Sequence, residues 1–264
     1  MGVEIEAVNP VYMVFLRAVI AILAAGFGGL LGMGRDRFSH RVLCSMVSLA
    51  AGALLAVTVV HIVPETFEIL GTGNALAGLA AGTLLFAGIG KFVYFVCPAC
   101  AASASERDTG YIRLGILLMV AMGIHSTVDG LAITAGCHSE HAAGLLILLA
   151  VSYHKVPEGL ALVSVARLAG YSRAKALGVT LLIETTTALG AFIGLIFLSG
   201  VSELMLGITL AVVAGSFIYT IGFALLKEMY AHEKGSILVY VALGFASIMA
   251  ISSVMERLGL HHQH

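Results

Sequence analysis

The chain has 264 residues, of which 59% are hydrophobic and only 11% charged, and its formal net charge is −1. Soluble domains carry roughly 25% charged residues, so this composition excludes a soluble globular protein. Its mean hydropathy of +1.03 predicts instead an all-α, polytopic membrane protein with one domain over residues 1–264. A net charge near zero, without a basic tract, gives no reason to expect a nucleic-acid partner.

Apolar runs separated by charged, glycine or serine clusters predict eight transmembrane helices, since a spanning helix needs about 20 apolar residues. The predicted spans are about 9–33, 42–62, 75–96, 112–136, 142–166, 174–199, 204–226 and 236–255. The longest loops are expected at 97–111 and 227–235. The first run follows Glu4 and Glu6 rather than a basic segment, so it is expected to be a retained span and not a signal peptide.

Basic residues concentrate on one side of this arrangement. The loops after spans one, three, five and seven hold Arg35, Arg37, Arg41, Arg107, Arg113, Arg167, Arg173, Lys175, Lys227 and Lys234. Because lysine and arginine are enriched in cytoplasmic loops, both termini are predicted to lie outside the cytoplasm of a cell (inner) membrane. Glycines four residues apart, such as Gly28 and Gly32 or Gly190 and Gly194, predict close approach between helices.

Two stretches in spans four and five each place a histidine four residues before a carboxylate: His125-Ser-Thr-Val-Asp129-Gly and His154-Lys-Val-Pro-Glu158-Gly. Residues four apart share one face of a helix. Such groups are costly in hydrocarbon unless they pair, line a wet cavity or hold an ion. Because the two spans are antiparallel neighbours joined by a short loop, their four side chains are predicted to form the central metal site near mid-membrane.

The ligand types narrow the choice of ion. Imidazole with carboxylate suits Zn²⁺, Fe²⁺, Co²⁺, Mn²⁺ or Cd²⁺, whereas Ca²⁺ and Mg²⁺ prefer oxygen and Cu(I) prefers sulfur. Zinc is favoured as the bound ion, and membrane lipid is the other expected partner. The oligomeric state stays open, with a homodimer as one alternative. Both histidines must lose their protons to bind metal, so acid is expected to weaken metal binding.

Lys155, between the ligands of span five, has two interpretations. It could be a salt bridge between helices that offsets the cost of burying carboxylates. Alternatively, charge counting assigns it the place of a second ion: Asp129, Glu158 and Lys155 sum to −1, and adding Glu184 of span six makes a site loaded with one divalent ion neutral. One metal ion per site is therefore predicted.

Other polar residues could serve the ion outside the central site. His61 and Glu65, at the outer end of span two, predict either a metal-gathering vestibule or an ordinary wet helix end. Weaker candidates lie in loops and at the carboxyl terminus, where an ordinary solvated or unstructured role is the alternative. They are Cys97, Cys100, His138, Glu140, His141, Glu228, His232, Glu233, His261, His262 and His264, whereas Glu68 has the same two alternatives as His61 and Glu65.

The two histidine motifs resemble those of the ZIP (Zrt/Irt-like) family of divalent metal transporters, in its compact prokaryotic form. The sequences His61-Ile-Val-Pro64-Glu65 and Gly215-Ser-Phe-Ile-Tyr219 are similar to the family as well. The resemblance implies eight helices, inward transport by alternating access and a mononuclear or binuclear site. It also implies that His125, Asp129, His154 and Glu158 are the transport-site ligands, with Ser126 and Lys155 where other members place second-metal ligands.

This sequence also departs from the family pattern. The histidine-rich loop that many members carry between spans three and four is absent, and Glu184 lies about one turn from the position expected for the carboxylate of span six. The competing function is an intramembrane zinc hydrolase, since histidine, carboxylate and zinc also activate water. The hydrolase is disfavoured because the chain has no His-Glu-x-x-His helix. A non-transporting metal sensor would need an output domain, which this sequence does not provide.

Overall fold

A computed structural model describes residues 10–34, 40–92, 109–138, 141–198, 203–231 and 234–257. Apart from short turns, these residues are helical, and no strand occurs among them. The elements are α1 (Pro10–Gly34), α2 (His40–Val57), the π-helical turn η1 (Thr58–Ile62), α3 (Val63–Phe92), α5 (Thr109–His138), α6 (His141–Leu168), α7 (Arg173–Glu184), α8 (Thr186–Leu198), α9 (Glu203–Ala231) and α10 (Lys234–Arg257). The predicted all-α class is confirmed.

Within the described residues, six helical segments are long and apolar enough to cross a membrane. They are Val11–Met33, Cys44–Ile89, Ala143–Arg167, Arg173–Leu198, Glu203–Gly222 and Gly235–Arg257. The second of these overlaps most of both predicted spans 42–62 and 75–96, and α5 covers the predicted span 112–136. Several apolar helices long enough to cross a bilayer are therefore present, and the division into eight crossings stays a prediction.

The junction between the second and third predicted spans is helical rather than a loop. Helix α2 continues through η1 directly into α3, and the direction of the chain changes inside α3, at Gly71. This residue has φ 69° and ψ 166°, a backbone conformation that glycine adopts without the steric cost of a Cβ atom. The turn thus needs one glycine and no polar linker, which is why polarity alone did not place it.

Further boundaries differ from the predicted ones. The predicted loop 227–235 is wrong for residues 227–231, because α9 continues to Ala231, and for its last two residues, because α10 begins at Lys234. The predicted loop 97–111 is wrong for its last three residues, because α5 begins at Thr109. The predicted span 174–199 is interrupted at Thr185, between α7 and α8. There the Thr185 hydroxyl donates to the Leu182 carbonyl, 2.6 Å away. Such a bond competes with the helical backbone ladder and favours a local break.

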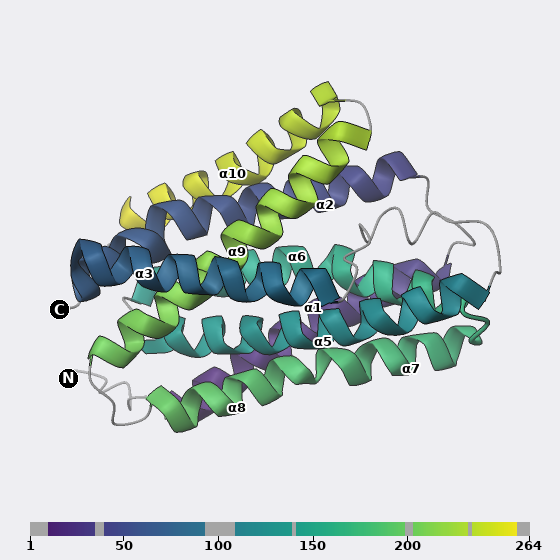
Figure 1. Ribbon diagram of the computed structural model, residues 1–264, viewed down its shortest axis with the longest axis horizontal. Helices are drawn as coiled ribbons and strands as arrows, with labels where there is room; N and C mark the ends of the chain where they lie inside the picture. Colours follow the sequence, from purple (N-terminus) through teal and green to yellow (C-terminus); the bar gives the residue numbers. More distant parts are fainter. Residues whose placement is uncertain are drawn as a thin grey trace, which may run out of the picture.

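We divide the helices into two groups by their four most extensive contacts, and the groups also meet each other where α2 packs against α6. In one group α1 packs against α6 and α5 against α8, with α7 beside them; in the other α3 packs against α9 and α2 against α10. Figure 1 shows α2, α9 and α10 above, and α5, α7 and α8 below. The start of α1 and the end of α10 lie at the same end of the molecule, whereas α2 and α7 begin at the other end.

Each of these four closest helix pairs is joined by two glycines that face each other across the contact. At each of these glycines an added Cβ would overlap a backbone carbonyl oxygen of the partner helix, so the backbones touch directly. The pairs are Gly28 with Gly159 (α1 and α6), Gly130 with Gly190 (α5 and α8), Gly82 with Gly215 (α3 and α9), and Gly52 with Gly244 (α2 and α10). The close approach predicted from the glycine spacing is confirmed.

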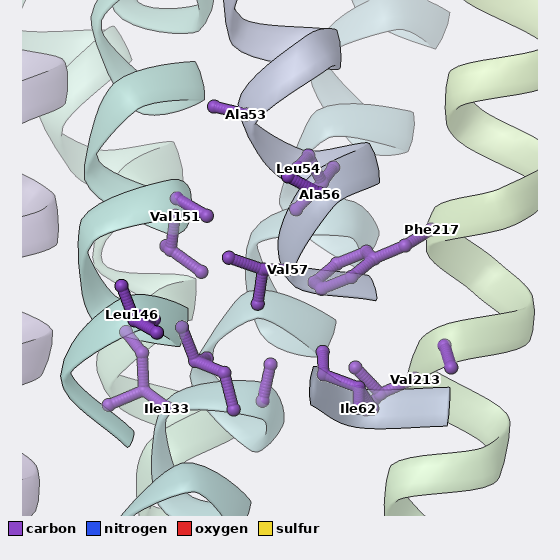
Figure 2. Close-up of a cluster of buried hydrophobic side chains, with 14 of the residues drawn as sticks. Ala53, Leu54, Ala56, Val57, Ile62, Ile133, Leu146, Val151, Val213 and Phe217 are labelled. Carbon is purple, nitrogen blue, oxygen red and sulfur yellow. The ribbon is translucent and has the colours of Figure 1, made fainter. Parts of the chain in front are cut away.

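Larger apolar side chains fill the space between the two groups. Figure 2 shows Phe217 of α9 pointing toward the segment of α2 that carries Val57, whose side chain points to the other side, where Val151 of α6 and Ile133 of α5 lie. All of them belong to one continuous buried cluster, which also includes Ile62 of η1. The groups thus meet through side chains, whereas inside each group the glycine pairs add direct backbone contacts to the packing of side chains.

We expect Gly244→Ala to destabilise the protein, because its Cβ would meet the Leu49 carbonyl and push α10 away from α2. Overpacking of this kind costs on the order of 1–3 kcal/mol. The measurement is thermal unfolding of purified protein in detergent. Gly178→Ala in α7 is the matched control, since nothing lies within 4 Å of its Cβ position. Equal unfolding temperatures for the two variants would contradict the backbone contact.

Candidate metal site

The two histidine and carboxylate pairs meet where α5 packs against α6. His125 and Asp129 come from α5, His154 and Glu158 from α6, and one ligand atom of each lies within 4.8 Å of the other three. Within the described part of the chain, this is the one group of three or more such side chains close enough to share an ion. The structure therefore brings together the four residues that the sequence selects.

Asp129 lies between the two histidines. Its Oδ2 atom is 3.2 Å from Nε2 of His154, and its Oδ1 atom is 3.8 Å from Nε2 of His125. The two imidazole rings are 5.5 Å apart between centroids, and Asp129 has no exposed surface. Both rings thus present Nε2 to the same carboxylate, as two ligands of one small cation would.

A hydrogen bond at Nδ1, the ring nitrogen that does not face Asp129, fixes the orientation of the His154 ring. Its Nδ1 atom lies 3.0 Å from the carbonyl oxygen of Ala150, one turn earlier in α6. A carbonyl can only accept, so Nδ1 carries the proton and donates, and in the neutral ring Nε2 presents a lone pair. That lone pair faces a carboxylate oxygen of Asp129 at 3.2 Å, an arrangement that a cation between them stabilises.

Lys155 lies at the centre of the polar network and is fully buried. Its Nζ atom is 2.9 Å from Asp129, 3.1 Å from Glu158 and 2.9 Å from Glu184, and it donates to the Ser126 hydroxyl at 2.6 Å. The Ser126 hydroxyl in turn lies 3.1 Å from Glu158. The salt bridge expected for Lys155 is confirmed, and it joins carboxylates from three helices.

Glu184 belongs to this network, although its place in the sequence differs from the family pattern. It is the last residue of α7, directly before the break at Thr185, and it is fully buried. Its Oε2 atom contacts Lys155, while its Oε1 atom has no hydrogen-bond partner; the same holds for Oδ1 of Asp129. Buried carboxylate oxygens normally have partners, so these two are available to an ion or to water.

Two phenylalanines that the sequence analysis did not select complete the surroundings. Phe86 of α3 contacts the His125 ring, and Phe217 of α9 contacts the His154 ring, each with 6.4 Å between ring centroids and in edge-to-face geometry. Their spacing in the sequence is that of ordinary core residues, so no local pattern distinguishes them. Only the packing of the two helix groups brings them to the site.

The predicted vestibule residues are separate from this cluster. His61 lies in η1, half-buried, with Nε2 3.4 Å from the Ser252 hydroxyl of α10, and Glu65 is half-buried in the first turn of α3. His138 is exposed, and its ring bonds to the Thr134 carbonyl of its own helix at 2.9 Å. The remaining candidates lie outside the described side chains, except Glu68, which is exposed: they are Cys97, Cys100, Glu140, His141, Glu228, His232, Glu233, His261, His262 and His264.

Comparison with known proteins independently supports the family resemblance of the two histidine motifs. The family model described as ZIP Zinc transporter matches residues 101–252, a range that includes the four clustered ligands, Lys155 and Glu184. The chain is 31% identical over 253 residues to a protein named Zinc transporter ZupT from Corynebacterium glutamicum, covering 90% of this chain and 96% of that relative. It is 30% identical over 269 residues to the Zinc transporter ZupT of Nitratidesulfovibrio vulgaris, covering 93% and 97%.

These matches extend over nearly the whole chain and agree with the multi-pass helical architecture. The similarity is therefore not confined to the two short motifs that first indicated it. By the matched family model and by full-length similarity to its curated relatives, the chain belongs to the ZIP zinc transporter family.

Proposed function

We propose that the protein transports a divalent metal ion, with zinc favoured, into the cytoplasm, and that His125, Asp129, His154 and Glu158 bind the ion on its way. The observation that carries this proposal is the convergence of these four ligand atoms within 4.8 Å of one another, inside a bundle of apolar helices. Two imidazoles and two carboxylates match the ligands that zinc takes in proteins. Iron, manganese, cadmium and cobalt use similar ligands and remain alternative substrates.

Transport is favoured over hydrolysis for two reasons. The relatives that match along their full length are named as transporters. In addition, Lys155 bonds to both carboxylates of the ligand set and to Glu184, so each carboxylate near the cluster already has a cationic neighbour. A general base for water activation works best as a carboxylate without a cationic neighbour, and all three carboxylates here contact the Lys155 ammonium.

The proposed setting is a cell (inner) membrane crossed eight times, with both termini outside the cytoplasm. Support comes from the shared end of the molecule at which α1 starts and α10 ends, and from the exposed Arg41, Arg173 and Lys175 near the starts of α2 and α7 at the other end. Exposed apolar side chains such as Leu23 and Leu243 would contact lipid. A homodimer would have to use part of the same outward surfaces.

We further propose that the site holds one metal ion at a time. If Asp129, Glu158 and Glu184 are ionised, they contribute −3 and Lys155 contributes +1, so a single divalent ion makes the buried site neutral. The ammonium group already lies 2.9–3.1 Å from all three carboxylates, where a second metal would have to bind. A second divalent ion would add uncompensated charge in a medium of low dielectric constant, which is strongly unfavourable.

Zinc flux into sealed liposomes tests the transport function. We expect wild-type protein to move zinc down its gradient, and Glu158→Gln to slow uptake by more than roughly tenfold, because it removes a charged ligand. His154→Ala should have a similar effect. Glu203→Gln is the matched control, since that carboxylate is exposed in the first turn of α9. Tight zinc binding by the wild type without any flux would instead support the hydrolase.

The number of zinc ions bound per chain tests the role of Lys155. Equilibrium binding to purified protein should give one zinc ion for the wild type. Lys155→Ala removes the ammonium and leaves three carboxylates together, so this variant should bind up to two ions and keep zinc transport. The idea fails if wild-type protein binds two ions side by side, or if Lys155→Ala abolishes transport.

His61 and Glu65 are proposed to attract the ion at the outer end of the protein. Both lie on the continuous helix formed by α2, η1 and α3, and π-helical turns such as η1 are frequent at functional sites. We expect His61→Ala to raise the KM for zinc uptake severalfold without changing kcat, since the central ligands stay intact. An unchanged KM would show that this end of the helix is ordinary wet surface.

A further inference from the structure

Two aromatic side chains from the second helix group lie against the proposed metal ligands of the first. Phe86 reaches His125 from α3, and Phe217 reaches His154 from α9. The ring planes are inclined by 72° and 70° to those of the imidazoles, and the phenylalanines are 2% and 1% exposed. Each histidine of the cluster therefore has a phenyl ring as a direct neighbour.

We propose that Phe86 and Phe217 determine metal specificity by keeping water out of the ligand cluster, so that an ion must shed its water to bind. The proposal rests on the proposed function and deepens it. A phenyl ring neither coordinates a cation through a lone pair nor offers a hydrogen bond to a water ligand. With a phenyl ring against each imidazole, an ion bound there finds no water ligand on the phenyl-covered sides, so its coordination sphere would come mainly from the four protein ligands.

The position of Phe217 is fixed by packing outside the site. It belongs to the buried cluster between the helix groups, and Figure 2 shows it projecting from α9 toward the segment of α2 that carries Val57. Phe86 extends from the helix that packs most closely against α9, where Gly82 and Gly215 bring the two backbones together. Both rings thus stand on a rigid helix pair that contributes none of the four clustered ligands, so they can act on hydration without altering the ligand set.

A dry site selects among ions by the cost of losing water. Zinc commonly binds in four-coordinate geometry to nitrogen and oxygen ligands of protein side chains. Magnesium usually keeps several of its waters in an octahedral shell, and manganese favours octahedral oxygen coordination. Excluding water therefore disfavours magnesium and manganese more than zinc, in a site whose ligand types alone would admit manganese.

Truncation of either ring should reverse this effect. Phe217→Ala would leave a cavity beside His154, and Phe86→Ala one beside His125. A cavity large enough for water, and bordered by polar groups, fills with water. A bound ion would then gain water ligands, and its coordination number would rise above four.

The test uses the purified full-length protein with Co²⁺, whose visible absorption is strong in four-coordinate sites and weak in octahedral ones. Wild-type protein should give the strong spectrum, and Phe86→Ala and Phe217→Ala should reduce its intensity severalfold. In liposomes, Mn²⁺ should compete with zinc uptake roughly tenfold better in these variants than in the wild type. Phe192→Ala, which removes a ring that is 50% exposed on α8, is the control and should match the wild type in both assays.

The milder variants Phe86→Val and Phe217→Val carry the test if the alanine variants do not fold, and they should shift both measurements in the same direction. The proposal is overturned if folded variants keep the wild-type cobalt spectrum and the wild-type preference for zinc over manganese. Failure of the underlying function would look different. In that case wild-type protein would bind no cobalt, or His154→Ala would leave cobalt binding unchanged.

Discussion

The contact between Lys155 and three buried carboxylates is the interaction on which the site depends. Asp129, Glu158 and Glu184 come from three helices, and without any cation among them, either the ammonium or a bound metal ion, their mutual repulsion in an apolar bundle would disfavour the packing of α5, α6 and α7. The ammonium offsets part of this repulsion and still leaves two negative charges in excess if all three are ionised. Under the proposed function, this remaining charge would attract a divalent ion.

Helix packing then determines how accurately the ligands are placed. Asp129 and Glu158 are each followed by a glycine, and these glycines, Gly130 and Gly159, are the ones that contact the backbones of α8 and α1. A ligand and the tightest helix contact therefore occupy adjacent residues. Any shift of a ligand helix would have to break such a contact, so the four ligands move, if they move, together with α1 and α8. The second helix group meets them through side chains, which hold position less strictly.

The four candidate ligands could be predicted from the sequence because histidine and carboxylate side chains are unusual in an apolar helix. Their spacing of four residues also places each pair on one face of its helix. The sequence could not place Glu184 with the same certainty, because the break at Thr185 depends on hydroxyl groups that compete with the backbone ladder. Phe86 and Phe217 could not be predicted as site residues from the sequence, because a buried phenylalanine is what an apolar helix is expected to contain. The change of direction at Gly71 lies in the interval 63–74 between two predicted spans, but the helical structure of that interval was not predicted, because a single glycine with positive φ takes the place of a loop.

The two histidine motifs have similar sequences but differ at the residue that follows each histidine. Ser126 and Lys155 follow the histidines of α5 and α6, and the structure joins them by a 2.6 Å hydrogen bond. If both positions held carboxylates or imidazoles, the cluster would gain ligands and negative charge, and a second divalent ion would be needed to balance it. A hydroxyl and an ammonium instead satisfy each other and the acids around them. The same backbone arrangement could therefore serve one ion or two, depending on the residues at these two positions, and a hydroxyl with an ammonium agrees with the single ion proposed for this chain.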